Sequence, residues 1–394
     1  MTITKNVNVA LIGQSFMGKA HSNAWNQVGK FFDAPLSITL HTICGRDTAK
    51  LQGFAANWGW HNVSADWKKV CRSGEIDLVD IATPNYLHAP MAIEAIRCGK
   101  HVACEKPLAG TLEDARKITS VASKANVKTF VWFNYRRCPA VALAHNLVRS
   151  GRIGQIRRVH ASYLQEWADE SIPLSWRFLK KQAGSGAHGD LNAHIVDMVR
   201  FVTGQEVIQV CGALAETFIS NRHKMVGSTG DGITEGLERD KGRVTVDDTV
   251  LFLARFSGGA VGSFEAARQA SGNYNRNSFE INGTKGAIRF DFERMNELQY
   301  LDTTADRAVQ GWTTIMCTHA GDHPYVDAWW PDGHIIGYEH TFTNMAYDIL
   351  AVLAGKKPIV PLPDFEDAYQ TQRVLEAVLI SAKEKRSVDL SQSK

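Results

Sequence analysis

The first third of the chain alternates short apolar runs with longer amphipathic segments. The apolar runs have the length of strands and occupy residues 7–12, 38–43, 78–82, 101–104 and 128–133. The segments between them have the length of helices and include residues 47–58, 87–98 and 111–124. Continuous apolar strands that alternate with helices predict βαβ units in a parallel sheet covered on both faces. We therefore expect an α/β fold that opens with a doubly wound, Rossmann-type domain over residues 1–134.

From about Gly154 the pattern changes to an alternation of apolar and polar positions. Residues 156–167 and 259–268 follow this period of two, and residues 277–290 combine two such runs around a glycine-containing turn. Alternation with tight turns is typical of antiparallel strands that have one wet face. We therefore expect a second domain over residues 135–394 that contains antiparallel strands.

Two further segments of this half have their own patterns. The polar, glycine-rich stretch 221–243 has little periodicity, which predicts a long exposed loop. Residues 364–385 space their apolar positions by three and four, which predicts a C-terminal helix that belongs to the second domain or packs back on the first.

Composition narrows the class of protein. At 394 residues the chain is longer than one ordinary core, and 44% hydrophobic with 22% charged residues are typical of a soluble globular protein. The net charge of +3 is spread along the chain, which disfavours nucleic acid as a partner. No apolar run reaches the roughly 18 residues of a membrane span and the N-terminus lacks the order of a signal peptide, so we expect a cytoplasmic protein. The seven cysteines form no C-x-x-C pair, which predicts thiols and neither a zinc site nor a disulfide framework.

A candidate phosphate-binding turn, "LIGQSFMGKAH", follows the first predicted strand. Its first glycine permits a tight turn, its second lets helix and strand approach closely, and the helix N-terminus offers N–H groups to a pyrophosphate. A serine stands where a glycine is usual, and its hydroxyl can itself donate to a phosphate. The residues of this turn that we expect to contact a dinucleotide are Gly13, Ser15, Phe16, Met17 and Gly18.

The choice between NAD and NADP depends on the end of the second predicted strand, "HTICGRD". Gly45 stands where an acid usually binds the adenosine ribose, and Arg46 and Asp47 follow it. An acid favours NAD, whereas an Arg accepts the 2′-phosphate of NADP. Asp47 is also placed to cap the next helix. We expect contacts to the cofactor from Arg46 and Asp47, with NAD as the cofactor and NADP left open.

The loop "ATPNYLHAP" follows the fourth predicted strand, at the edge where open α/β sheets bind ligands. Thr83, Pro84 and Asn85 suit a loop over the nicotinamide ribose. His88 either reaches the same region, caps the next helix or lies at the surface.

The loop "CEKPLAG" follows the fifth predicted strand at the same edge. Glu105 and Lys106 are held there by Pro107. Near the positive charge of an oxidised nicotinamide the pKa of Lys106 should fall, which suits it to assist the removal of a proton from an alcohol. The alternative is a surface Glu–Lys pair.

The segment "GSGAHGDLNAHIVD", residues 184–197, places two acids and a histidine on one face of a predicted helix. His194 suits acid–base chemistry, because an unperturbed pKa near ~6.5 lets an imidazole take and return a proton around neutral pH. A metal site of Asp190, His194 and one of His188 or Asp197 is an alternative, since ligands four residues apart share a helical face. We expect no metal.

Large aromatic side chains accompany polar ones in the second half. Trp167 lies two residues after Gln165, and Arg177 follows Trp176 in "PLSWRF". Sugars present apolar C–H faces to rings and hydroxyls to polar groups, so this mixture suits a carbohydrate pocket. Each Trp taken singly also suits core packing.

These motifs together resemble the Gfo/Idh/MocA oxidoreductases, the family of glucose-fructose oxidoreductase and inositol dehydrogenase. The matching stretches are the glycine turn, "TPNYLHAPMAIEAIRCGKHVACEKPLA", "NYRR" and "GDLNAHIVD". The resemblance implies a Rossmann domain followed by an α/β domain on a large, mostly antiparallel sheet, with NAD(P) and a sugar or cyclitol as ligands. It also implies a homodimer or homotetramer formed through the open face of that sheet.

Residue roles follow from the same resemblance. By motif, Lys106 and His194 are the catalytic pair and Asp190 is the substrate-binding acid. "FNYRR", "PLSWRF", "AGSGAHGD" and "GYEHTF" are most similar to members that oxidise levoglucosan or other glycosides at the sugar C3. The cofactor-binding residues implied in the two loops are Thr83, Pro84, Asn85, His88, Glu105 and Lys106. The substrate-binding residues expected are Lys106, Tyr135, Arg136, Gln165, Trp167, Arg177, Asp190, His194 and His340.

The sequence therefore predicts an NAD(P)-dependent oxidoreductase that transfers hydride between a nicotinamide and a secondary hydroxyl of a sugar or glycoside. In this hypothesis the hydroxyl proton passes to His194 with help from Lys106, and Asp190 holds a neighbouring hydroxyl. The alternatives are an inositol dehydrogenase or sugar reductase of the same family, and a non-catalytic NAD(P)-binding sensor on the same fold.

Overall fold

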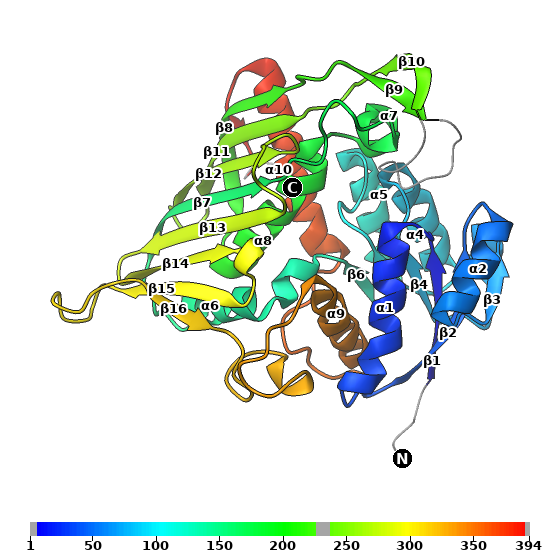
Figure 1. Ribbon diagram of the computed structural model, residues 1–394, viewed down its shortest axis with the longest axis horizontal. Coiled ribbons are helices and arrows are strands. Elements are labelled where there is room, and N and C mark those ends of the chain that lie inside the picture. The colour runs from blue at the N-terminus through cyan, green and yellow to red at the C-terminus, as the bar shows by residue number, and fades with distance from the viewer. Residues whose placement is uncertain (1–5, 226–236, 391–394) are drawn as a thin grey trace. The chain divides into compact units, whose positions relative to one another are not determined.

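The computed structural model describes residues 6–225 and 237–390, which form two compact units (Figure 1). The first unit contains the described residues up to Arg137 together with Gly337–Tyr369. The second contains the described residues from Cys138 to Ile336 and from Gln370 onward.

A six-stranded parallel sheet forms the centre of the first unit. Its strands are β1 (Asn6–Ile12), β2 (Ser37–Cys44), β3 (Asn62–Ser64), β4 (Leu78–Ile81), β5 (His101–Cys104) and β6 (Thr129–Val131), in the order β3-β2-β1-β4-β5-β6. The five predicted runs are all strands of this sheet, and the short β3 completes one edge. This strand order is that of the Rossmann fold, so the predicted Rossmann-type fold is confirmed.

Helices cover both faces of this sheet. The connecting helices are α1 (Phe16–Phe31), α2 (Thr48–Trp58), α3 (Trp67–Arg72), α4 (His88–Arg97) and α5 (Leu112–Ala122). Because parallel crossovers are right-handed, and the chain reverses direction across the sheet after β3, α1 and α2 lie on one face and the other three on the opposite face. The reversal falls between β1 and β4, and open α/β sheets bind their ligands at the carboxyl ends of such strands.

Gly337–Tyr369, which includes α9 (Tyr338–Leu353), belongs to the first unit, whereas the pattern predicts one second domain over residues 135–394. α9 packs beside α1. The guanidinium of Arg137 is fully buried, lies 3.3 Å from the Asp348 carboxylate on α9 and donates to the Val360 carbonyl at 3.0 Å. These partners are 211 and 223 positions away along the chain, a separation that local periodicity does not reveal.

A nine-stranded sheet forms the centre of the second unit. Its strands are β7 (Ile156–Leu164), β8 (Val207–Glu216), β11 (Thr249–Phe256), β12 (Val261–Ala267), β13 (Arg276–Gly283), β14 (Gly286–Asp291), β15 (Glu297–Asp302), β16 (Thr313–Met316) and β17 (Val388–Asp389). They follow the order β16-β15-β14-β13-β7-β12-β11-β8-β17. β7 and β12 pair in parallel and the other neighbours pair antiparallel, so the expected large, mostly antiparallel sheet is confirmed.

One face of the nine-stranded sheet is covered and the other carries exposed side chains. The helices α6 (Pro139–Arg149) and α8 (Ala193–Thr203) pack on the covered face. Along β11, Val250 and Phe252 are buried whereas Leu251 and Leu253 are exposed, as the period of two predicts. The apolar residues exposed on β8, β11 and β12 are Leu214, Leu251, Leu253 and Val261.

The predicted loop over residues 221–243 is wrong for its described part. Asn221–Met225 and Leu237–Arg243 are the strands β9 and β10, which pair antiparallel, and residues 226–236 lie outside the described residues. Arg222 of β9 is buried, donates to the carbonyls of Ala168 and Ile172 at 2.7 and 3.0 Å, and lies 4.0 Å over the Phe178 ring. Hydropathy cannot distinguish a charged side chain that is buried against carbonyls from one in an exposed loop. The predicted C-terminal helix is confirmed as α10 (Phe365–Glu384).

The described residues also bear on the expectations from composition. None of their helices is long and apolar enough to cross a membrane. All seven cysteines are thiols, and burial raises the pKa of Cys44, Cys71, Cys138 and Cys317 to about 12. Within residues 6–225 and 237–390, no group of three or more His, Cys, Asp or Glu side chains is arranged to hold a metal.

Candidate active site

The glycine turn after β1 has a backbone that only glycine fits. Gly13 has φ +125°, and a Cβ there would lie 2.2 Å from the Ala82 carbonyl oxygen. A Cβ on Gly18 would lie 2.3 Å from the Gly13 carbonyl oxygen. The backbones of this turn therefore approach closely, with no side chain between them, at the carboxyl ends of β1 and β4, where α1 begins. This cradle and the N-terminus of α1 fit a dinucleotide pyrophosphate.

The residues between the two glycines begin α1. Ser15 is the N-cap, and its carbonyl accepts from Lys19 N–H at 3.0 Å, whereas its hydroxyl makes no capping bond within the described chain. The Phe16 side chain is exposed and its ring stacks on Tyr338 with centroids 6.3 Å apart. Met17 is half-buried in the first turn.

The turn after β2 uses Asp47 as a helix cap. The Asp47 side chain accepts from Lys50 N–H at 3.1 Å at the start of α2. Arg46 is exposed beside it, and a Cβ on Gly45 would lie 3.1 Å from the Gln14 side-chain oxygen. The capping alternative for Asp47 is therefore realised, and its cofactor contact stays a prediction.

The loop after β4 is fastened by a buried histidine. His88 is fully buried, with Nε2 2.8 Å from the Thr83 carbonyl oxygen and Nδ1 3.0 Å from the Pro107 carbonyl oxygen. Burial lowers its pKa, although the two carbonyls act in the opposite direction. Of the three alternatives left open for His88, the surface position is wrong, because the side chain is buried. His88 joins the loop of Thr83, Pro84 and Asn85 to the loop after β5.

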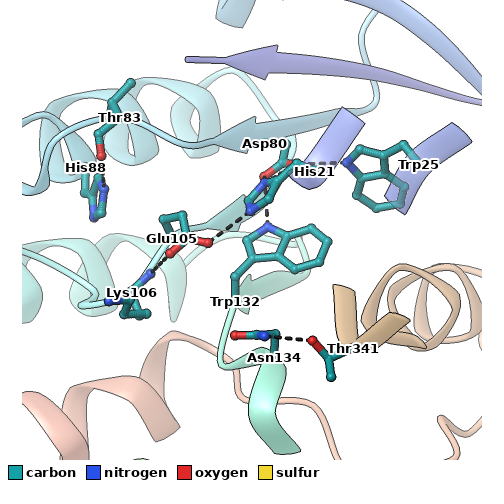
Figure 2. Close-up of polar contacts among 10 residues, drawn as sticks. All are labelled: His21, Trp25, Asp80, Thr83, His88, Glu105, Lys106, Trp132, Asn134 and Thr341. Atoms are coloured by element: carbon teal, nitrogen blue, oxygen red, sulfur yellow. Dashed lines mark hydrogen bonds and ion pairs between the residues drawn. The ribbon is translucent and has the colours of Figure 1, made fainter. Parts of the chain in front are cut away.

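Lys106 follows a carboxylate whose two oxygens are both engaged (Figure 2). Glu105 is 5% exposed; its Oε2 accepts from the Lys106 backbone N–H at 3.0 Å and its Oε1 lies 3.0 Å from His21 Nε2. The surface Glu–Lys pair is therefore not realised for Glu105, because its carboxylate points inward. Lys106 itself is half-buried at the carboxyl end of the sheet.

His21 of α1 lies between two carboxylates in this buried cluster (Figure 2). Its Nδ1 is 3.0 Å from an oxygen of Asp80, a residue of β4 with no solvent exposure. The indole N–H groups of Trp25 and Trp132 donate to Asp80 at 2.8 and 2.9 Å. Burial alone would lower the pKa of His21, but Asp80 and then Glu105 outweigh it and raise this pKa to about 9.

The "NYRR" segment lies beside α9 in the same unit. Asn134 donates to Thr341 at 2.8 Å (Figure 2), and the ring of Tyr135 lies 6.4 Å from that of Tyr338. Arg136 is 4% exposed and forms an ion pair with Asp367 at 2.7 Å. The Arg136 guanidinium is thus engaged inside its own unit.

His340 caps the N-terminus of α9, close to Tyr338 and Thr341 along the chain. Its Nδ1 accepts from the Gly337 N–H at 3.0 Å and lies 3.4 Å from a carboxylate oxygen of Glu339. Burial lowers the pKa of His340, and the Glu339 charge opposes that effect. Its predicted contact with substrate stays untested beside this capping role.

In the second unit, the segment that carries Asp190 and His194 is anchored at its start by Asp247. The Asp247 carboxylate accepts from the N–H groups of Gly186 and His188, both at 2.8 Å, and a Cβ on Gly186 would lie 1.8 Å from the Asp247 carbonyl oxygen. Residues His188–Asn192 then form a π-helical turn that leads into α8. Such turns are rare inside helices and recur at functional sites.

Asp190 lies between two guanidinium groups. One of its carboxylate oxygens is 3.8 Å from Arg177 Nη1 and 3.7 Å from Arg268 Nη1. Arg268 is almost wholly buried and lies 5.5 Å from the centroid of the Trp167 ring. The arrangement brings three of the predicted substrate residues, Asp190, Arg177 and Trp167, around Arg268.

A chain of polar side chains leads from Trp167 toward His194. Trp167 Nε1 donates to Gln165 at 2.8 Å, the Gln165 amide donates to Asn275 at 2.7 Å, and the Tyr163 hydroxyl donates to the same Asn275 oxygen at 2.6 Å. The Tyr163 ring lies 5.8 Å from the ring of His194, which is 7% exposed. Gln165, Trp167 and His194 therefore lie in one connected region of the second unit.

Comparison with known proteins agrees with this geometry. A profile described as the oxidoreductase family with an NAD-binding Rossmann fold matches residues 7–133, and one described as the GFO/IDH/MocA C-terminal domain matches residues 141–289. The levoglucosan dehydrogenase of Pseudarthrobacter phenanthrenivorans is 41% identical over 394 residues, covering 98% of this chain and 99% of the relative. The chain belongs to the Gfo/Idh/MocA family of oxidoreductases.

Solved structures of this family match the chain over nearly its whole length. The oxidoreductase domain protein from Kribbella flavida is 44% identical with a TM-score of 0.92, covering 98% of this chain and 100% of that one. Levoglucosan dehydrogenase in complex with NADH and levoglucosan is 39% identical with a TM-score of 0.91, covering 99% and 100%. The expected family, the NAD-binding fold and the class of oxidoreductase are confirmed, and the roles of single site residues stay predictions.

The sequence reasoning missed the cluster of His21, Asp80, Trp25 and Trp132. A signal for it was present, because Asp80 interrupts the otherwise apolar run "LVDIA" of a strand predicted to be buried. A buried carboxylate needs donors, and the residues that supply them come from α1 and from the position directly after β6. Nothing in the local pattern names those donors.

Proposed function

We propose that the protein is an NAD-dependent dehydrogenase that oxidises a secondary hydroxyl, at C3, of a sugar or glycoside of the levoglucosan or glucoside type. The identity of 41% with levoglucosan dehydrogenase carries this proposal, because the match spans both units and so includes the glycine turn and the segment of Asp190 and His194. Fold alone would not support a substrate class.

Bound NAD supplies the hydride acceptor, which no side chain of the protein can provide. We assign its pyrophosphate to the thin turn from Gly13 to Gly18 and to the N-terminus of α1. We assign its adenosine ribose to Arg46 and Asp47, and its nicotinamide end to the loop that begins at Thr83.

The acid–base chemistry is assigned to Lys106 and His194. In the proposal His194 takes the proton of the substrate hydroxyl and Lys106 assists its departure, while Asp190 accepts a hydrogen bond from a neighbouring hydroxyl. Two observations support these roles. Asp190 has guanidinium groups on two sides, which hold its carboxylate in place as an acceptor. His194 adjoins a region of hydroxyl and amide groups that suits a sugar.

We further propose a cytoplasmic homodimer or homotetramer that forms through the open face of the nine-stranded sheet. Leu251 and Leu214 are directly opposite on β11 and β8, and both are exposed. Leu253 and Val261 extend this apolar strip. Light scattering after size exclusion tests it: the native chain should be oligomeric, and a charged residue in place of Leu251 and Leu253 should give monomers.

A panel of sugars with NAD⁺ and with NADP⁺ tests the activity. We expect NADH to form with levoglucosan and simple glucosides, and more slowly with free glucose and inositols. Levoglucosan deuterated at C3 should transfer its label to the cofactor, whereas deuterium at C2 or C4 should stay in the sugar. Turnover of inositols alone would identify an inositol dehydrogenase, and NADH binding without turnover of any cyclic polyol would identify a sensor.

A further inference from the structure

The buried cluster beneath Lys106 has a charge pattern that no single hydrogen bond explains. His21 has a carboxylate at each ring nitrogen, with Asp80 3.0 Å from Nδ1 and Glu105 3.0 Å from Nε2. A neutral imidazole has one N–H and would set a lone pair against one of these carboxylates. The doubly protonated ring donates to both, so two ionised carboxylates at these distances favour the cation.

The remaining contacts of the two carboxylates differ. Asp80 also accepts from the indoles of Trp25 and Trp132, so it keeps two donors without His21. Among the described residues, Glu105 also accepts from the backbone N–H of the next residue, Lys106. The orientation of the Glu105 carboxylate therefore depends on His21. The position of the Lys106 backbone N–H in turn depends on the Glu105 carboxylate.

A second buried histidine fixes the other side of Lys106. His88 lies 3.0 Å from the carbonyl oxygen of Pro107 and 2.8 Å from that of Thr83. The backbone around Lys106 is thus held on both sides. The Glu105 carboxylate binds the Lys106 N–H, and His88 binds the carbonyl of Pro107. Such double anchoring directs a side chain that is itself only half-buried.

We propose that His21 is a positioning residue for Lys106, acting through Glu105 to fix the backbone from which the lysine extends. This inference rests on the catalytic role proposed for Lys106. It assigns to α1 a second task besides its N-terminal contact with the dinucleotide: one turn further along, the same helix sets the position of the proton-transfer group.

His21 also sets the charge beneath Lys106. With the cation present, the cluster of His21, Asp80 and Glu105 has one positive and two negative charges; without it, two carboxylates share one dry site. The two like charges repel each other there, and the negative charge near Lys106 increases. The Cys104 thiol, which precedes Glu105, stays neutral because burial raises its pKa.

The experiment compares His21→Gln with Trp60→Phe in the full-length enzyme, using levoglucosan and NAD⁺. Trp60 is buried and donates its indole N–H to Ser22 at 3.0 Å, so its loss removes a contact to α1 beside His21 without touching either carboxylate. We measure kcat, KM, the Kd for NADH and the melting temperature of both variants, and record kcat/KM against pH.

We expect His21→Gln to lower kcat by about tenfold to a hundredfold, because a displacement of about 1 Å in a catalytic group has effects of this size. The Kd for NADH should stay near the native value, and the acid limb of the pH profile should move to higher pH. Trp60→Phe should lower the melting temperature and leave kcat and the pH profile unchanged. Equal kcat values and equal pH profiles in the two variants would overturn the proposal.

Two further variants separate this inference from the function on which it rests. Full turnover in Lys106→Ala would refute the catalytic role of Lys106, whatever His21 does. If His21→Gln does not fold, Glu105→Ala replaces it and should lose kcat in the same way, whereas Glu105→Gln, which keeps an oxygen for the Lys106 N–H, should recover most of it. Native kcat in Glu105→Ala would overturn the positioning role.

Discussion

The Nη1 atom of Arg268 lies 3.7 Å from a carboxylate oxygen of Asp190, and the arginine side chain is 1% exposed whereas that of Asp190 is 18% exposed. The pair thus has a buried cationic end and an anionic end that faces outward. The Arg268 guanidinium also lies 5.1 Å from the centroid of the Phe178 ring and 5.5 Å from that of Trp167. A planar cation held on two rings fixes the position of the carboxylate in front of it.

Arg268→Met should weaken sugar binding and leave NADH binding unchanged. Asp190 would lose its buried partner Arg268, so its carboxylate would be less well oriented toward a hydroxyl. We expect KM for the sugar to rise about tenfold, the effect of losing a hydrogen bond to a charged group. Arg276→Met is the control, since Arg276 is half-exposed and pairs with Asp291 elsewhere on the sheet. A native KM in Arg268→Met would contradict this role.

Lys106→Ala and His194→Ala should each reduce turnover by about 10²–10⁴-fold, the contribution usual for positioned acid–base groups. Both variants should bind NADH with nearly native affinity, because neither side chain belongs to the glycine turn. Steady-state kinetics and a fluorescence titration with NADH measure the two quantities. A variant that keeps near-native turnover removes that residue from the proposed pair.

Gly13→Ala should abolish dinucleotide binding and destabilise the protein. The new methyl group would meet the Ala82 carbonyl oxygen at 2.2 Å, in a backbone at φ +125°. Such strain costs about 1–3 kcal/mol. Gly29→Ala is the matched control in α1, because a Cβ there meets nothing within 4 Å and alanine favours a helix by about 1 kcal/mol. The melting temperature should therefore fall in Gly13→Ala and rise in Gly29→Ala. NADH binding should be lost in Gly13→Ala and unchanged in Gly29→Ala.

The parts of the fold that sequence could predict are those with local repeats. Strand and helix lengths in the first unit follow from apolar periodicity, and β11 shows its alternation in Leu251 and Phe252. Sequence patterns could not predict that Gly337–Tyr369 belongs to the first unit, because this depends on Arg137 and its partner Asp348, 211 positions away. Distant ion pairs leave no periodic trace.

The residues of the candidate site likewise include some that the sequence could predict and others that it could not. Gly13 and Lys106 stand at positions that the strand–loop pattern singles out, so their location could be predicted. Asp247 could not be, although it anchors the segment of His194 through two backbone N–H groups. An acid that caps a turn 59 residues away looks like any surface acid in the sequence.

Asp47→Ala and Asp47→Ser should separate helix capping from cofactor choice. Alanine removes the bond to Lys50 N–H and should cost about 1 kcal/mol of stability, which serine should largely restore. Both changes remove the carboxylate, so both should reduce the preference for NAD⁺ over NADP⁺. Melting temperatures and the ratio of kcat/KM for the two cofactors check this. An unchanged ratio in Asp47→Ser would leave Asp47 as a cap alone.

Stability should fall as the pH rises through about 9, because the pKa of His21 is raised in the folded protein from 6.5 to about 9. A raised pKa means that the folded chain holds this proton more tightly than the unfolded chain. Its stabilisation is therefore complete below pH 6.5 and is lost as pH passes the folded value, with a total of about 3 kcal/mol.

Urea unfolding between pH 6 and pH 10 measures this loss in the native protein, in His21→Gln and in Trp60→Phe. Tyrosine, cysteine and lysine titrate in all three, so only the difference between the curves reports on His21. The free energy of unfolding should decline more steeply in the native protein and in Trp60→Phe than in His21→Gln. Parallel curves would mean that His21 is neutral between its two carboxylates, and that one of those carboxyls carries the proton instead.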